Sequence, residues 1–154
     1  MYRNLMLGLA MLVVCVVIQC FVVSLLLRVL AAVKTTVKPT LGATTGVLTA
    51  VMLIMVAGNV GQGALWAGLF MALGEYQDFA TAFYCSVVNF TTLGYGDMVM
   101  SEQNRLLGAL EAGNGTLMLG LTTSVLFLVL HMAVQKVWTE RFMKGGDDGA
   151  QEIL

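Results

Sequence analysis

The residues whose types and spacing could do chemistry are seven in a row near the middle of the chain: Thr91, Thr92, Leu93, Gly94, Tyr95, Gly96 and Asp97. Glycine can leave the usual backbone regions without a side-chain penalty, and here one residue separates two glycines. Successive backbone carbonyls can then turn toward one axis, where their oxygens can replace the water that a cation sheds. An ordinary glycine-rich turn is the alternative interpretation.

The order of these residues resembles the selectivity filter of tetrameric potassium channels, whose pattern is Thr-Val-Gly-Tyr-Gly-Asp. Leu93 replaces the commoner valine, and the other positions match. The resemblance implies that K⁺ is the bound metal ion and that its ligands are the carbonyls of Thr92, Leu93, Gly94, Tyr95 and Gly96, with the Thr92 hydroxyl at the innermost site. It also implies that Thr91 supports the filter and that Asp97 lies at the outer mouth.

The composition is that of a membrane protein. Of the 154 residues, 58% are hydrophobic and 11% are charged, and the net charge of −1 gives no indication of nucleic-acid binding. A soluble domain of this size carries more charges. The spacing of the cysteines fits neither a zinc site nor a redox motif; they are Cys15, Cys20 and Cys85.

Apolar segments divide the chain. Each of the three longest can cross a bilayer core of about 30 Å as a helix; they cover residues 5–27, 43–73 and 105–134. A cleaved signal peptide is the competing interpretation of the first, but its apolar run is long for a signal core and no clear cleavage site follows. The glycine cluster Gly58–Gly63 lacks the context of a phosphate-binding loop and indicates close helix packing. Asn59 and Gln62 are expected to hydrogen-bond across a helix interface; a kink is the alternative interpretation.

We therefore expect an all-α membrane protein with three transmembrane helices, a re-entrant pore helix and a filter loop. The N-terminal helix and its basic connection occupy residues 1–41, the pore domain 42–135 and a short cytoplasmic tail 136–154, in which Gly145–Gly149 is expected to be disordered. The pore domain consists of an outer helix, a pore helix over 78–90 with Asp78 as N-cap, the filter over 91–97 and an inner helix over 105–135. Tyr84 and Cys85 stand where many relatives carry tryptophans, which leaves the stiffness of the filter's support open.

The charge distribution predicts the orientation. Lysine and arginine gather between Arg28 and Lys38 and in the tail, and such segments stay in the cytoplasm. The N-terminus and the filter loop then lie outside and the C-terminus inside. We expect a cell-membrane location, and the compactness of the chain suggests a bacterial inner membrane.

The inner helix contains an ionisable residue and several candidate gating residues. Glu111 lies about 9 Å inward of Arg105 at 1.5 Å per residue, and we expect Glu111 and Asn114 to hydrogen-bond to the back of the filter or pore helix; a carboxyl without a role is the alternative. Small residues and Phe127 share one face, which indicates either a cavity lining or close helix packing. In the first case Gly115 or Gly120 is the bending point and Phe127 a constriction. His131, the only histidine, either senses inside pH or has no such duty.

One loop cannot enclose a pore, so the resemblance implies a homotetramer in a lipid bilayer, with potassium ions as ligands and no cofactor. The predicted function is potassium-selective conduction. The alternatives are a weakly selective cation channel, against which Tyr95 argues, and a non-conducting regulatory subunit of another channel. No catalytic constellation can be assembled from the sequence, so an enzyme is not expected.

Overall fold

The fold, seen in a computed structural model that describes residues 2–33 and 41–151, is a bundle of α-helices. Its helices are α1 (Tyr2–Val33), α2 (Leu41–Ala72), α3 (Phe79–Phe90) and α4 (Arg105–Gln151). Three of them, α1, α2 and α4, are long and apolar enough to cross a membrane. The described ranges contain no β-strand. The predicted all-α class with three spans and one short additional helix is confirmed.

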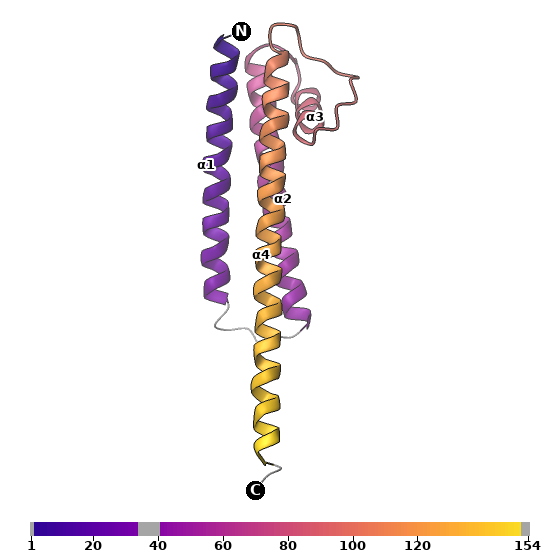
Figure 1. Cartoon of the computed structure of the whole chain (residues 1–154). Coiled ribbons are helices and arrows are strands. Elements are labelled where there is room, and N and C mark those ends of the chain that lie inside the picture. The colour runs from indigo at the N-terminus through magenta and orange to yellow at the C-terminus, as the bar shows by residue number, and fades with distance from the viewer. Residues whose placement is uncertain (1, 34–40, 152–154) are drawn as a thin grey trace.

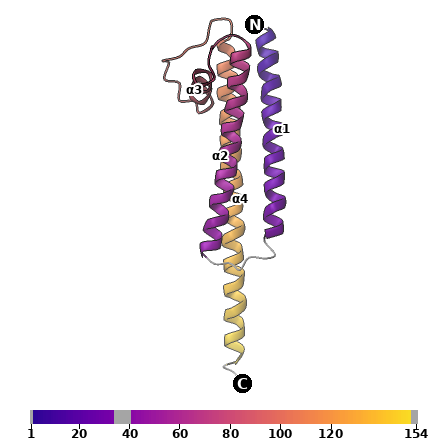
Figure 2. The same ribbon diagram turned by 180° about the vertical axis from the view of Figure 1, so that it is seen from behind.

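The short helix and the first helix lie on opposite flanks of the bundle. α2 and α4 run side by side in the middle, with α1 on one flank and α3 with its following loop on the other (Figures 1 and 2). α3 and the loop stay near the end of the bundle at which α1 begins (Figure 1). The N-terminal end of α1 and the 91–97 loop therefore belong to the same side of the membrane-spanning bundle.

The glycine cluster of α2 forms part of a continuous helix. Asn59 Nδ2 donates to Thr122 Oγ1 of α4 at 3.1 Å, and Gln62 Nε2 donates to Gln19 Oε1 of α1 at 2.7 Å. A side chain at Gly63 would contact Ser86 of α3 at 3.5 Å. The predicted hydrogen bonds across helix interfaces are confirmed, and the cluster is a packing feature rather than a loop.

Two apolar clusters hold the helices together, and α1 contributes to both. Near the loop end, Cys15 of α1 packs with Trp66 and Phe70 of α2 and Leu107 of α4. Toward the other end, the core consists of Leu26, Val51, Met55, Val125 and Val129. The first helix is thus integrated into the bundle along its length. Within the described ranges Cys15, Cys20 and Cys85 are free thiols.

The inner helix is longer than predicted. We expected it to end at residue 135 and Gly145–Gly149 to be disordered, but α4 continues to Gln151 and extends well past the other helices (Figure 1). No proline interrupts this stretch, and a glycine costs a helix only about 1 kcal/mol relative to alanine. The prediction of disorder rested on the polar, glycine-rich composition of residues 145–149, and this composition does not end the helix. The basic connection with Lys34, Lys38 and Pro39 lies outside the described residues.

Candidate functional site

The short helix α3 begins at the N-cap that the sequence predicted. Asp78 has an extended backbone, with φ −126°, and its carboxylate accepts the Thr81 N–H at 2.9 Å. This side-chain-to-backbone bond satisfies one of the free N–H groups of the first turn. The hydrogen bond from Thr81 also lowers the pKa of Asp78, because it stabilises the charged carboxylate.

The C-terminal end of α3 is tied to the start of the 91–97 loop. The Thr92 N–H donates to Asn89 O at 2.8 Å, and the Leu93 N–H donates to Val88 O at 3.0 Å. These two bonds, with Thr92 at φ 59°, form a Schellman motif. The base of the loop is therefore fixed by the backbone of α3.

The loop itself has an alternating backbone. Thr92, Gly94 and Gly96 have φ values of 59°, 59° and 75°, whereas Leu93 and Tyr95 between them do not have positive φ. Among the described residues Thr92 is the only non-glycine with positive φ, a conformation that costs about 1–3 kcal/mol and persists where its surroundings impose it. All residues from 91 to 97 are exposed in the single chain, so this chain leaves their polar backbone uncovered.

The outer end of the loop is held by a residue that we did not identify from the sequence. The Tyr84 hydroxyl, on α3, donates to Asp97 Oδ2 at 2.7 Å. Together with the Schellman motif at the base, this bond ties both ends of the loop to α3. The available signal was the position of Tyr84, which corresponds to the tryptophans described above for the family that the sequence resembles. A phenol hydroxyl can donate a hydrogen bond as an indole N–H does.

A second support lies where the loop returns to α4. Glu75, in the turn between α2 and α3, accepts hydrogen bonds from Ser101 N at 2.9 Å, from Asn104 Nδ2 at 2.6 Å and from the Ser101 hydroxyl. Burial alone would raise the pKa of Glu75, but the bonds from Ser101 and Asn104 outweigh it and lower the pKa. The charged form of Glu75 is thus the one that holds the loop.

This carboxylate makes the stability of the fold depend on pH. A pKa lowered by folding contributes stability that is present above the unfolded pKa and is lost as the pH falls through the folded value. We expect the thermal midpoint of the purified protein to fall as the pH drops below the ordinary glutamate pKa of about 4.3, and Glu75→Gln to flatten that decline. Glu102→Gln, at an exposed residue of the same loop, is the control. Equal pH profiles for Glu75→Gln and the unmodified protein would contradict the assignment.

Glu111 reaches α3, the predicted pore helix, as expected. It is fully buried, its Oε1 lies 2.5 Å from Ser86 Oγ, and Ser86 Oγ also lies 2.7 Å from Gly63 O. A serine hydroxyl has one hydrogen, so both short contacts are favourable only if Glu111 donates a proton to Ser86 and Ser86 donates to Gly63. Glu111 Oε2 is buried without a hydrogen-bond partner, which a neutral carboxyl tolerates better than a carboxylate. The geometry thus fits a neutral Glu111 that joins α2, α3 and α4.

Removal of the central hydroxyl should weaken this junction. Ser86→Ala removes the hydrogen-bond partner of the buried Glu111 Oε1, which costs about 1–3 kcal/mol, whereas Gly63 O keeps its hydrogen bond within α2. Glu111→Gln keeps a donor toward Ser86 and should cost less. The check is the thermal midpoint of each purified variant. A Ser86→Ala protein as stable as the unmodified one would argue against the hydrogen-bond chain.

The expected hydrogen bond of Asn114 to the filter or pore helix is not formed. Asn114 is fully buried, but its Nδ2 and Oδ1 make no hydrogen bond to any part of the chain that the structure describes. Its amide faces Cys15 of α1. The prediction failed because the Asn114 side chain, turned by about 60° around α4 from that of Glu111, lies near Cys15 of α1.

The two candidate bending points of α4 differ in their surroundings. A Cβ at Gly115 would lie 1.8 Å from Phe90 O and 2.6 Å from Phe90 C, at the last residue of α3. A Cβ at Gly120 would meet no atom within 4 Å. Gly115 is therefore a point of backbone contact between the inner helix and the base of the loop, whereas nothing in the single chain restrains Gly120.

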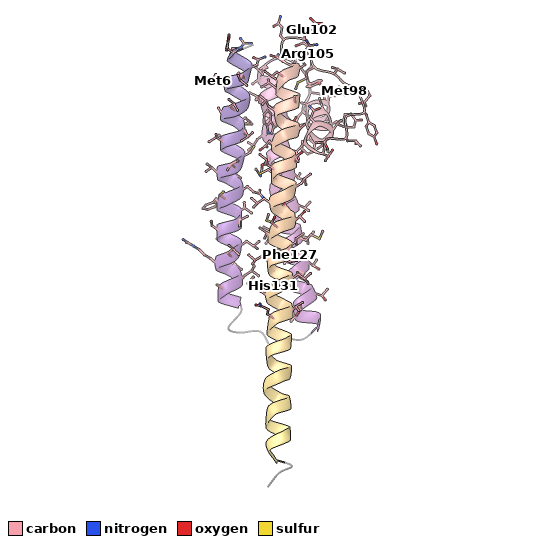
Figure 3. All side chains as sticks on the ribbon, in the orientation of Figure 1. Met6, Met98, Glu102, Arg105, Phe127 and His131 are labelled. Atoms are coloured by element: carbon pink, nitrogen blue, oxygen red, sulfur yellow. The ribbon has the colours of Figure 1, made fainter. Side chains whose placement is uncertain are left out.

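Phe127, the candidate constriction, lies on α4 far from the loop. Its side chain is 70% exposed, and its ring stacks on that of His131 with centroids 6.2 Å apart. Figure 3 shows both residues on α4 toward the end opposite Glu102 and Met98. The residues of the predicted cavity-lining face are likewise exposed in the single chain; they are Gly113, Thr116, Gly120, Thr123 and Phe127.

These features define the class of the molecule: a membrane protein in which a short helix and an irregular, exposed loop connect the last two spans. Residues 49–131, more than half of the 154 residues, match the family described as ion channel. The chain belongs to this ion channel family. The match begins within α2, so α1 lies outside it. Comparisons with curated proteins and with solved structures gave no match.

Proposed function

We propose that this ion channel conducts potassium selectively through a filter built from the 91–97 loop. The observation that carries the proposal is the alternation of positive φ at Thr92, Gly94 and Gly96. Where right-handed and left-handed backbone conformations alternate, successive N–H groups converge on one side of the chain. The carbonyl groups then point to the other side. A row of carbonyl oxygens is the ligand set that replaces the hydration shell of K⁺.

Four copies of the chain complete the proposed pore. Irregular backbone at membrane depth is tolerated only where protein or a water-filled path covers it, and the loop from 91 to 97 is exposed in one chain. A homotetramer with closed symmetry places four such loops around one axis. Each ring of oxygens then contains one carbonyl from every subunit, from Thr92 at the inner end to Gly96 at the outer end, and the Thr92 hydroxyls complete the innermost site.

The contacts around the loop support selectivity in this proposal. Tyr84 holds Asp97 at the outer end, the Schellman motif holds Thr92 at the inner end, and the Glu111–Ser86 pair joins α3 to the inner helix. A supported loop cannot easily contract or expand, so the oxygen rings keep the number and arrangement of ligands that favour K⁺ over Na⁺.

The proposed orientation places the loop outside the cell. The start of α1 and the loop lie at the same end of the bundle (Figure 1), and the basic segments belong to the opposite end by the positive-inside tendency. In this arrangement the protein is a multi-pass component of the cell membrane with a cytoplasmic C-terminus.

Flux into liposomes that contain only the purified chain tests the proposal. We expect K⁺ uptake that barium blocks, and no comparable uptake of Na⁺. In mixtures of K⁺ and Na⁺, the reversal potential should follow the K⁺ gradient. Comparable Na⁺ uptake would instead identify a weakly selective cation channel. No flux from correctly inserted tetramers would identify a subunit that needs another channel.

A further inference from the structure

The first turn of α1 is hydrogen-bonded to the loop that returns from the filter to α4. Asn4 is 3% exposed, and its Nδ2 lies 2.5 Å from Gln103 O and 2.6 Å from Asn104 Oδ1. An amide NH₂ group carries two hydrogens and can donate to both acceptors at once. The bonds connect residues that lie 99 and 100 positions apart in the chain.

The same network continues to the turn between α2 and α3. Asn104, itself buried at 6% exposure, donates from Nδ2 to Glu75 Oε1 at 2.6 Å. Glu75 in turn accepts the Ser101 N–H at 2.9 Å. Three segments that are distant in sequence are thus joined by side-chain hydrogen bonds around residues 101–104. A charge-assisted bond at Glu75 makes this network stronger than one of neutral groups alone.

Contacts that α1 makes after its first turn fix the position of Asn4. Gly8 lies so close to α4 that a Cβ there would come within 2.3 Å of Leu110 Cδ1. About two and three turns further along α1, Cys15 packs against Trp66 and Leu107, and Gln19 bonds to Gln62. Because α1 is held at each of these levels, Asn4 is presented to the loop by a docked helix rather than by a free end.

We infer that Asn4 is a positioning residue for the outer end of the filter, an inference that rests on the proposed function. Residues 98–104 connect Asp97 to α4 without a regular helix. Their attachment to α1 through Asn4 limits how far the outer filter can move. α1, which lies outside the family match, thereby supplies a support for the conducting loop from the flank opposite α3 (Figure 2).

The test compares two disruptions of α1 in the full-length chain. Asn4→Ala removes the bonds to the return loop, whereas the double variant Gln19→Leu/Gln62→Leu removes the bond of α1 at mid-membrane and leaves no amide unpaired. Each protein is reconstituted in liposomes, and the ratio of K⁺ to Na⁺ uptake and the thermal midpoint are measured. We expect Asn4→Ala to lower the uptake ratio at least about fivefold, the lower range of coupling between sites. The double variant should change only the midpoint.

A second pair of variants keeps the inference falsifiable if Asn4→Ala assembles poorly. Asn104→Ala breaks the same link from the loop side and should lower the uptake ratio similarly. Adding Asn4→Ala to Asn104→Ala should then have little further effect, because both act through one network. An unchanged ratio in Asn4→Ala or Asn104→Ala, or full additivity of the two, would overturn the inference. An unmodified protein that does not prefer K⁺ would instead refute the proposed function.

Discussion

Alanine in place of Gly115 is expected to reduce K⁺ flux by at least about tenfold, the effect of about 1.4 kcal/mol. The added methyl group would lie 1.8 Å from Phe90 O and 2.6 Å from Phe90 C. Both are backbone atoms of the last residue of α3, so no side-chain rotation can relieve the overlap. Overpacking of a well-packed contact costs about 1–3 kcal/mol, and in the proposed tetramer every subunit bears that cost at the base of its filter loop.

Flux per reconstituted protein, with the thermal midpoint measured in parallel, checks this expectation. Gly61→Ala is the matched control, because Gly61 is also in a membrane-spanning helix and a Cβ there meets nothing within 4 Å. That variant should be at least as stable as the unmodified protein, since alanine favours a helix over glycine by about 1 kcal/mol. If Gly115→Ala conducts and unfolds like Gly61→Ala, the contact between α4 and the base of the loop is not what positions the filter.

Alanine at Gly94 is expected to abolish the preference for K⁺ while the chain still folds. Gly94 has φ 59°, and the nearest atom to an added Cβ is Thr92 O at 4.0 Å, so the single chain has room for the methyl group. The cost is conformational: a left-handed backbone costs an L-residue about 1–2 kcal/mol. When the backbone relaxes this strain, φ of residue 94 leaves the positive region and the alternation is broken. Every subunit of the proposed tetramer then loses an aligned carbonyl.

The control for Gly94→Ala is a substitution with the same backbone penalty elsewhere. Gly74, in the turn after α2, has φ 77° and also has nothing within 4 Å of an added Cβ. Gly74→Ala should lower the thermal midpoint about as much as Gly94→Ala but keep the ratio of K⁺ to Na⁺ uptake. Selective uptake by Gly94→Ala would show that the carbonyls of this loop do not select the ion.

Several elements of this protein could be predicted from sequence because their signals are local. The three spans follow from long apolar runs, and α3 begins where Asp78 can cap it. Gly94 and Gly96 have the positive φ that their spacing suggested. Each of these features depends on residues within a few positions of one another, so the pattern of residue types is sufficient to indicate it.

The sequence was less informative where a prediction depended on the size of an effect or on which neighbouring helix a side chain meets. The glycines near the C-terminus do not end α4, because their small helix penalty is not reinforced by a proline. Asn114, only three positions after Glu111, faces α1 while Glu111 faces α3. Residues three positions apart lie on the same side of a helix, separated by only about 60°, and the sequence does not state where on that side the contact with one neighbour gives way to the contact with the next.

Thus the sequence by itself determined the class, the spans and the residues of the candidate filter, through hydropathy, capping and the freedom of glycine. Only the tertiary structure decided what surrounds the candidate filter: Ser86 as the partner of Glu111, Tyr84 as the partner of Asp97, and Asn4 as a partner of the return loop. It also distinguished Gly115 from Gly120. These contacts join positions from 13 to 100 residues apart, and such pairs form only when the packing of four helices has set the distance between them.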